Sequence, residues 1–220
     1  SFVVADGRNT HRPAPIEPPL RRSSACCARR RTLTLSKEVV AEGAVIEAGA
    51  YIKGEKIYIG PGALVERAWL KGRRILVDRG AKVLVNTRLR DNIILGEAAE
   101  AGFSADIKNA VFLPRSAAAH FVYAGDSLVG RRVNLADKTT LSNLRHDGKA
   151  PRVRVGGETL DTGLRKFGAV VGDDVRTGCV TTLNPGTLVG KGVWTYDHTV
   201  LSGVVAPGHG RHDDVGVQLE

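Results

Sequence analysis

The sequence predicts an all-β fold, a left-handed parallel β-helix shaped as a triangular prism, with one inserted polar hairpin loop. A six-residue repeat is the first observation. From Val171 the 220-residue chain divides into six consecutive hexads, VGDDVR, TGCVTT, LNPGTL, VGKGVW, TYDHTV and LSGVVA. Composition is the second, because 5% aromatic residues and 26 glycines suit thin, repetitive β-structure better than a thick packed core.

The hexads predict which side chains point inward. A helix with 3.6 residues per turn cannot keep a period of six in phase, whereas a short strand followed by a turn can. We expect the first and fifth positions of each hexad to face the core. The first positions are Val171, Thr177, Leu183, Val189, Thr195 and Leu201, and the fifth are Val175, Thr181, Thr187, Val193, Thr199 and Val205. Three hexads close one coil, and about eight coils would stack at about 4.8 Å.

The chain divides into three parts. Residues 1–37 carry eight Lys or Arg against two acidic residues and are rich in Pro and Ser, so they predict a disordered arm or linker remnant. Residues 38–208 form the β-helix, with earlier hexads at Val40–Tyr51, Ile59–Leu64 and Val129–Thr140. Two segments break the repeat: Lys71–Asn92, which is irregular, and Leu144–Phe167, an inserted loop that contains a VRV-GG-ETL hairpin. Residues 209–220 are a C-terminal tail.

Composition and spacing exclude several classes of function. The net charge is +9, but most of the surplus lies in the arm, and no nucleic-acid-binding motif accompanies it. No apolar run reaches the roughly 20 residues of a membrane helix. Three cysteines without a CxxC pair, and six histidines without ligand spacing, support neither a disulfide framework nor a metal site. We therefore expect a cytoplasmic protein with no nucleic-acid partner, membrane association or metal.

The stretch HFVYAGDSLVGRRVN (His120–Asn134), followed by SNLRHDGK, carries a family resemblance. It resembles the acetyltransferase half of bifunctional glucosamine-1-phosphate N-acetyltransferase/N-acetylglucosamine-1-phosphate uridylyltransferases, including their archaeal-type relatives. The resemblance covers residues 38–208. It implies an acyltransferase that uses acetyl-CoA as co-substrate and an amino-sugar 1-phosphate as substrate. It also implies a homotrimer, and an N-terminal nucleotidyltransferase domain that is absent from this chain.

The same resemblance implies roles for individual residues. His120 matches the catalytic base, and Asp106 a carboxylate that orients it. Arg90, Lys108, Tyr123 and Asn134 match groups that bind the sugar phosphate. The chemistry agrees, because imidazole can take a proton from an attacking amine near neutral pH and phosphate favours Arg and Lys donors. The acetyl-CoA side is matched by five positions: Ala136, Asn143, Lys149, Arg152 and Cys179.

One departure supports an alternative function. Relatives read N-L-G-A-G-T after the asparagine, whereas this chain reads N-L-A-D-K-T at Asn134–Thr139. If Lys138 must adopt a left-handed conformation, the cost is on the order of 1 kcal/mol. The alternative is a non-catalytic β-helix that trimerises and regulates a sugar-1-phosphate nucleotidylyltransferase domain. The His120, Tyr123 and Asn134 spacing favours the enzyme, and the substituted turn favours the alternative.

Overall fold

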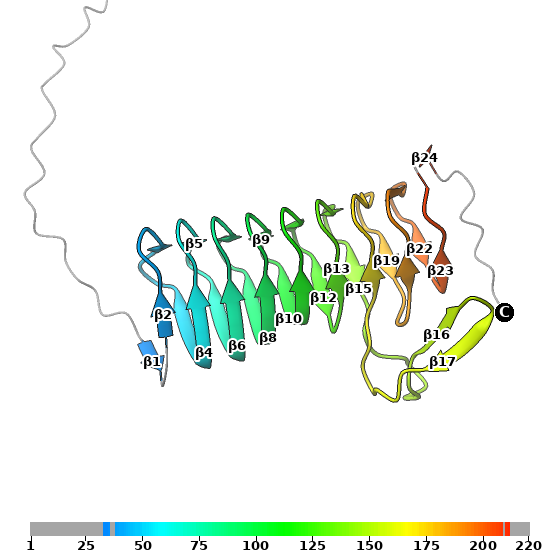
Figure 1. Ribbon diagram of the computed structural model, residues 1–220, viewed down its shortest axis with the longest axis horizontal. Helices are drawn as coiled ribbons and strands as arrows, with labels where there is room; N and C mark the ends of the chain where they lie inside the picture. Colours follow the sequence, from blue (N-terminus) through cyan, green and yellow to red (C-terminus); the bar gives the residue numbers. More distant parts are fainter. Residues whose placement is uncertain (1–32, 36–37, 209, 212–220) are drawn as a thin grey trace, which may run out of the picture.

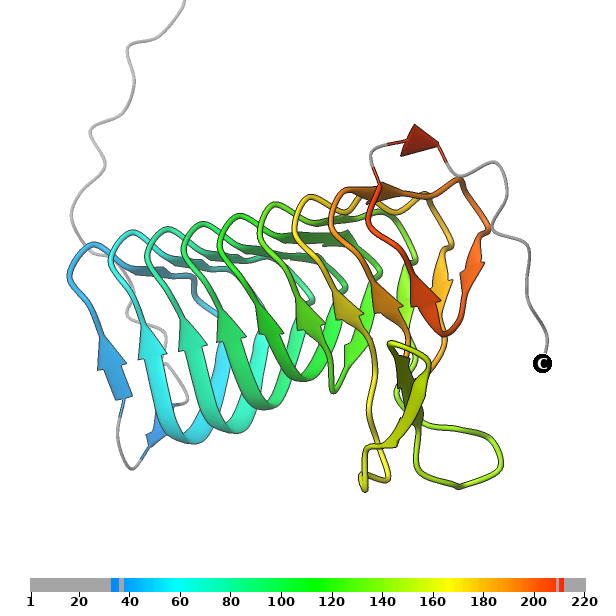
Figure 2. The same cartoon turned by 45° about the vertical axis from the view of Figure 1, so that its right-hand side comes forward.

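The protein is a straight parallel β-helix whose coils follow one another along a single axis (Figure 1). The computed structural model describes residues 33–35, 38–208 and 210–211, and every named element in them is a β-strand. Each coil is roughly triangular, as the tilted view shows (Figure 2). The predicted parallel β-helix is confirmed.

The first face of the prism is a ladder of nine parallel strands in the described residues. These strands are β1 (Leu33–Leu35), β4 (Tyr51–Ile59), β6 (Trp69–Val77), β8 (Arg88–Leu95), β10 (Asp106–Phe112), β12 (Tyr123–Gly125), β15 (Thr140–Leu141), β19 (Thr182–Leu183) and β22 (Val200–Leu201). β4, β6, β8 and β10 are long enough to bend over a corner, so that their second halves lie on the next face.

The second face continues from those bent strands. The second half of β4 pairs with β2, and that of β10 pairs with β13. The shorter strands of this face are β2 (Glu38–Val40), β13 (Leu128–Val129), β18 (Val170–Val171), β20 (Leu188–Val189) and β23 (Val204–Val205).

The third face is a separate parallel sheet. It contains β3 (Val45–Ile46), β5 (Leu64–Val65), β7 (Lys82–Val83), β9 (Glu100–Phe103), β11 (Ala117–His120) and β14 (Asn134–Leu135). Single bridges through Arg176 extend it to β21 (Val193–Trp194), which pairs with β24 (Gly210–Arg211).

Coil length is nearly constant. Paired residues on successive coils lie 16 to 19 positions apart, as in Leu188 to Val204 and Val45 to Leu64. One coil is much longer: Thr140 and Thr182 pair directly although 42 positions separate them, and the same step separates Leu128 from Val170. The additional residues form an excursion containing β16 (Arg152–Val155) and β17 (Glu158–Asp161), an antiparallel hairpin that projects from the prism (Figures 1 and 2). The predicted VRV-GG-ETL hairpin is confirmed.

The core is one continuous column of aliphatic side chains inside the prism. Most of the inward positions predicted from the hexads are buried, including Val171, Leu183, Val193 and Leu201 at 1% exposure or less. Toward the C-terminal end this burial weakens, since Thr195, Thr199 and Val205 are partly exposed. The six-residue repeat therefore predicts correctly most of the side chains that face the core.

Three predictions about boundaries need correction. Lys71–Asn92 does not break the coil, because β6 and β8 pair over most of their length, with a single register shift between Lys71 and Arg74. Parallel pairing begins at Leu33, inside the segment predicted as an arm, and continues to Arg211, inside the predicted tail. The described residues form about nine coils rather than eight. Residues 1–32, 36–37, 209 and 212–220 lie outside the described part.

Candidate active site

Arg90 and Asp106 form the best-defined ion pair on the first face. Arg90 donates from Nε to Asp106 Oδ1 at 2.8 Å and from Nη2 to Oδ2 at 2.9 Å. Arg88, which lies directly opposite Asp106 in the ladder, brings its Nε within 3.6 Å of the same carboxylate. Such a two-pronged pair holds both side chains in fixed orientation. Asp106 therefore positions the two arginines and offsets one of their two positive charges.

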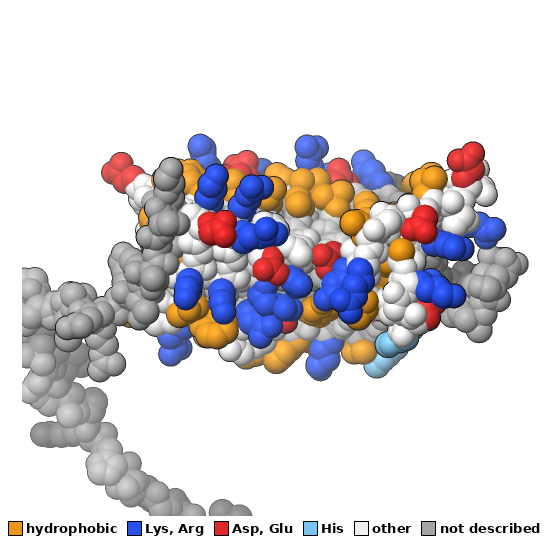
Figure 3. Space-filling model, turned by 90° about the horizontal axis from the view of Figure 1, so that it is seen from below, with side chains coloured by type: hydrophobic (Ala, Val, Ile, Leu, Met, Phe, Trp, Pro, Cys, Tyr) orange, Lys and Arg blue, Asp and Glu red, His pale blue; other side chains and the backbone are white. Residues whose placement is uncertain are grey.

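Four cations lie in one row on the same face, which we call the cationic row. The register places Lys53 opposite Lys71, Lys71 opposite Arg90, and Arg90 opposite Lys108. Like charges directly opposite each other on neighbouring strands destabilise the pairing of those strands. Only Arg90 and Lys108 have recorded carboxylate partners among the described residues; that of Lys108 is Asp91, 3.5 Å away. Figure 3 shows Lys and Arg gathered on the underside of the prism. The row is suited to an anion.

Tyr123 and Asn143 lie beside the end of this row. Tyr123 Oη donates to Asn143 Oδ1 at 3.3 Å, and the Asn143 Nδ2 amide donates to Asp126. Both side chains cross Gly125, where an added Cβ would overlap the Asn143 amide and lie 2.7 Å from Tyr123 Oη. The absence of a side chain at Gly125 is what lets the tyrosine and the asparagine meet. Arg90, Asp106, Lys108, Tyr123 and Asn143 thus form one polar cluster on the first face.

His120 occupies the corner between the third and first faces, which we call the His120 corner. It is the last residue of β11, and its side chain is exposed. No hydrogen bond or ion pair joins it to Asp106 among the described residues, so the structure does not show Asp106 orienting the imidazole. The rings of Phe103 and Phe121 meet edge to face beside it, with centroids 5.1 Å apart. The imidazole is open to solvent and bordered by an aromatic pair.

Lys138 lies at the same corner, one coil further on, and has a φ of 57°. Lys138 thus adopts the left-handed conformation whose cost the sequence analysis considered. It is the rule at this corner, since a positive φ recurs on successive coils at non-glycine residues. These are Asn86, Ser104, Phe121, Lys138, Val180 and His198. The coil therefore accommodates Lys138 without a glycine, and the N-L-A-D-K-T departure is compatible with the fold.

Asn134, Ala136 and Cys179 lie on the third face or at its corner. Asn134 is exposed between Ala117 and Arg176, and the Ala136 amide donates to Thr177 Oγ1 at 2.9 Å. Cys179 occupies the corner position of His120 two coils further along. The corner hydrogen bonds establish this equivalence, since the amides of Lys138, Val180 and His198 donate to the carbonyls of His120, Asp137 and Cys179. These three site residues share an edge with His120.

Lys149 and Arg152 lie on the excursion and are exposed. The excursion leaves the prism after Asn143 and returns at Phe167, whose amide donates to the Asn143 carbonyl at 3.0 Å. It packs near Gly186, where an added Cβ would be 2.6 Å from the Arg152 carbonyl. The Arg145 guanidinium and the Lys149 amide hold the pKa of Asp147 well below its usual range. Arg152 therefore lies near the edge of the first face opposite His120, and Lys149 lies on the same excursion.

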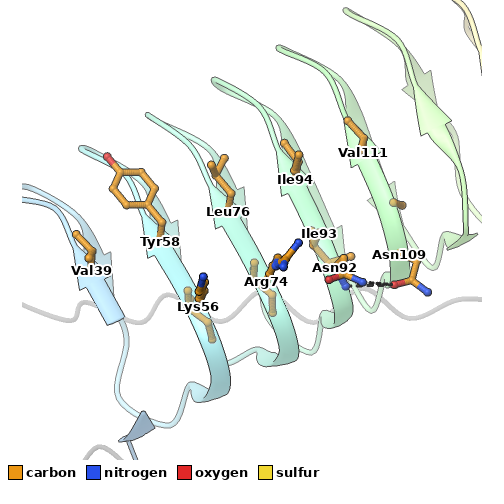
Figure 4. Close-up of a pocket in the computed structure, with 13 residues that line it drawn as sticks. Val39, Lys56, Tyr58, Arg74, Leu76, Asn92, Ile93, Ile94, Asn109 and Val111 are labelled. Carbon is orange, nitrogen blue, oxygen red and sulfur yellow. Dashed lines mark hydrogen bonds between the residues drawn. The ribbon is translucent and has the colours of Figure 1, made fainter. Parts of the chain in front are cut away.

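A groove of about 840 Å³ lies on the second face and not at the polar cluster. One wall is a row of apolar side chains that includes Tyr58, Leu76 and Ile94, and the other contains Lys56 and Arg74 (Figure 4). The apolar wall belongs to a longer line, which we call the apolar row. Its members are Val39, Tyr58, Leu76, Ile94, Val111, Leu128, Val170, Leu188 and Val204.

Two other kinds of site are absent from the part of the chain that the structure describes. No helix there is long and apolar enough to cross a membrane. No three residues of the His, Cys, Asp and Glu types gather there in a way that could hold a metal ion.

The chain is similar to curated bifunctional enzymes. A bifunctional sugar-1-phosphate nucleotidylyltransferase/acetyltransferase of Sulfurisphaera tokodaii is 37% identical over 117 residues, which are 53% of this chain and 29% of the relative. The bifunctional protein GlmU of Methanococcus aeolicus is 35% identical over 106 residues, covering 48% of this chain and 26% of the relative. That of Nocardia farcinica is 32% identical over 152 residues, covering 69% and 27%. The chain is a homologue of these bifunctional enzymes. The predicted resemblance is confirmed.

The other comparisons add less. No family model matches the chain. The UDP-N-acetylglucosamine acyltransferase from Campylobacter jejuni is a structural neighbour at 20% identity and a TM-score of 0.35, covering 77% of this chain and 69% of the neighbour. The polysialic acid O-acetyltransferase OatWY follows at 16% identity and 0.38, covering 77% and 83%. The chain spans only about a quarter of the length of the curated bifunctional enzymes that it matches.

The structure shows further polar residues near the candidate site that sequence reasoning missed. Asn92, Asn109 and Asp126 form a hydrogen-bonded ladder with Asn143 at the corner between the first and second faces. All four follow one another at intervals of 17 residues. This spacing equals the length of one coil, so the sequence alone could have indicated that the four residues lie in one row. Arg88 was also missed, although it lies two residues before Arg90 and points to the same face.

Proposed function

We propose that this chain is an acetyltransferase that transfers the acetyl group of acetyl-CoA to the amine of an amino-sugar 1-phosphate. The observation that carries the proposal is the polar cluster of Arg90, Asp106, Lys108, Tyr123 and Asn143 on one face, next to His120 at its edge. Homology to enzymes named as acetyltransferases supports it. The amino-sugar substrate rests on the spacing of His120, Tyr123 and Asn134.

The phosphate of the substrate binds Arg90 and Lys108 in this proposal. These two cations lie opposite each other on neighbouring strands, so two phosphate oxygens can meet both. Their carboxylate partners, Asp106 and Asp91, keep them extended but leave the nearby lysines of the cationic row uncompensated. Positive charge therefore exceeds negative charge where the phosphate arrives.

His120 is the general base. The amine attacks the thioester carbonyl, a C–N bond forms, and the C–S bond to coenzyme A breaks. His120 takes the proton from the amine and returns it to the departing thiolate, so protons and electron pairs balance. Imidazole suits this exchange because it titrates near neutral pH. The exposed position of His120 leaves its ring accessible to a substrate held on the first face.

Acetyl-CoA is proposed to contact groups from two copies of the chain. Ala136 and Cys179 lie on the third face or the His120 corner, whereas Lys149 and Arg152 lie across the first face on the excursion. One cofactor meets both sets when neighbouring copies contribute one set each. The homotrimer expected from the resemblance satisfies this requirement.

The apolar row supports such an assembly. It runs unbroken along the second face, and Val39, Ile94 and Val204 are 57%, 44% and 54% exposed. A straight apolar row parallel to the prism axis is covered along its whole length only by another straight body. A second copy of this prism has that shape. We propose that the row packs against a neighbouring copy in the trimer, and that the protein acts in the cytoplasm as part of a longer bifunctional enzyme.

The alternative is a non-catalytic β-helix that trimerises and regulates a nucleotidylyltransferase. The N-L-A-D-K-T turn motivates it, because Lys138 and Asp137, which pair at 3.2 Å, place charged side chains beside the His120 corner. Binding of the sugar phosphate without acetyl transfer would favour this alternative. The upstream reading frame of the gene then decides whether a nucleotidylyltransferase domain accompanies the chain.

The decisive experiment is acetylation of glucosamine 1-phosphate by the wild type and by His120→Ala. If His120 is the base, the variant should be slower by roughly 10²- to 10⁴-fold, with an unchanged melting temperature. His198→Ala is the matched control, since His198 lies at the same corner on a later coil. Equal rates for His120→Ala and wild type would remove the catalytic assignment.

A further inference from the structure

We propose that Asp126 is a positioning residue that makes the Tyr123 hydroxyl a hydrogen-bond acceptor toward the substrate. The inference rests on the proposed function, because it concerns the same site. It is carried by the direction of three consecutive hydrogen bonds at the corner between the first and second faces.

The first step fixes the asparagines. Asp126 is held at the corner by its own amide, which donates to the Lys108 carbonyl at 2.8 Å, and it has a φ of 47°. Its carboxylate receives Asn109 Nδ2 at 3.1 Å on one oxygen and Asn143 Nδ2 on the other. An ionised carboxylate accepts hydrogen bonds and cannot donate them. Both amides must therefore turn their NH₂ groups toward Asp126.

The second step fixes the tyrosine. With Nδ2 of Asn143 facing Asp126, Oδ1 faces Tyr123, and the two oxygens are 3.3 Å apart. A carbonyl oxygen only accepts, so the single proton of the phenol must lie on this hydrogen bond. Asn143 is 6% exposed, which leaves its amide little water to bind in another orientation. Asp126 thereby determines where the Tyr123 proton points.

The third step concerns the substrate. A phenol whose proton is already donated offers only lone pairs to a ligand. Tyr123 therefore accepts a hydrogen bond from a sugar hydroxyl or amine and does not donate one to a phosphate oxygen. The phosphate is left to Arg90 and Lys108, which are pure donors. The corner thus separates the recognition of the sugar from the recognition of the phosphate.

The test measures the affinity of glucosamine 1-phosphate and of inorganic phosphate by calorimetry for Asp126→Asn, Tyr123→Phe and the double variant. An amide at position 126 can pair with Asn143 in either orientation, so the direction of the Tyr123 proton is no longer fixed. We expect Asp126→Asn to weaken the sugar phosphate roughly tenfold, the size of one hydrogen bond. The affinity for inorganic phosphate should not change. In the Tyr123→Phe background, Asp126→Asn should have no further effect.

Two results overturn the proposal. One is an equal loss of affinity for both ligands, which indicates general damage to the face. The other is a full additional effect of Asp126→Asn when Tyr123 is already phenylalanine. Asp173→Asn is the matched control, because Asp173 accepts the Arg131 amide at the opposite corner and should leave both affinities unchanged.

A second measurement keeps this inference separate from the proposed function. Hydrogen exchange of the Asn143 side-chain amide, followed by NMR in the absence of ligand, should be slow in the wild type and faster in Asp126→Asn. Equal exchange in the two proteins overturns the role of Asp126 whatever is found for binding. If the wild type binds no amino-sugar phosphate but the exchange differs as expected, the proposed function fails and the fixed polarity of Tyr123 stands.

Discussion

Gly125 is the residue on which the polar cluster depends most directly. A Cβ there would overlap the Asn143 amide and lie 2.7 Å from the Tyr123 hydroxyl oxygen. We expect Gly125→Ala to separate the pair, lower the melting temperature by several degrees and weaken glucosamine 1-phosphate binding. Calorimetry and thermal melting measure both effects. Adding Asn143→Ala frees part of the space that the new methyl group needs. The melting temperature of the double variant should therefore fall by less than the sum of the two single decreases.

The residue-level predictions show what the sequence can supply. The resemblance grouped Arg90, Lys108, Tyr123 and Asn134 as sugar-phosphate ligands. The structure brings the first three together on the first face and places Asn134 on the third. The partner of Asp106 could not be predicted, because the contact with Arg90 spans 16 residues and depends on the length of the intervening coil. A register shift of one residue would have turned the Asp106 side chain from the outside of the prism toward its core. His120 and Asp106 are close in the sequence motif, yet they lie on different elements.

Of all the elements, the excursion is the one whose removal should destabilise the prism least. Thr140 and Thr182 pair across its base, and Phe167 bonds to Asn143, so the ends to be joined are neighbours. Replacing residues 144–166 by a short Gly-Ser linker should lower the melting temperature by no more than about 5 °C. The KM for acetyl-CoA should rise because Lys149 and Arg152 are removed, while the KM for the sugar phosphate stays near that of the wild type.

Steady-state kinetics and thermal melting measure the outcome of this replacement. The Lys149→Ala, Arg152→Ala double variant in the full chain is the matched control, and its KM for acetyl-CoA should rise to a similar extent. A drop of more than about 10 °C for the shortened chain would show instead that the excursion stabilises the prism.

The elements also explain why the repeat was visible in some coils and hidden in others. Near the C-terminal end each face is a two-residue strand between turns, so three hexads fill one coil. Near the N-terminal end β4, β6 and β8 are eight or nine residues long and bend through a corner. The step from Trp69 to Arg88 then takes 19 residues, one more than three hexads. This extra residue, together with the register shift between Lys71 and Arg74, broke the hexad frame across Lys71–Asn92.

For the whole molecule, the apolar row predicts how copies assemble. An arginine in the middle of the row would have to lose its water if a neighbour covered it. We expect Ile94→Arg to reduce the mass of the particle toward that of one chain, measured by light scattering at micromolar concentration. Val45→Arg is the control, because Val45 is 54% exposed but lies on the third face. An unchanged mass for Ile94→Arg would show that the row is not the contact.

Before any contact forms, the cationic row already acts on a dissolved phosphate. Its four charges span three strand spacings, about 14 Å, along one side of a rigid body. Such an arrangement draws in oppositely charged small molecules and speeds their encounter with the surface. Salt shortens the reach of this attraction to about 8 Å at physiological ionic strength. Capture of a sugar phosphate is therefore faster in dilute buffer than in concentrated salt, while the encounter with an uncharged sugar depends little on salt.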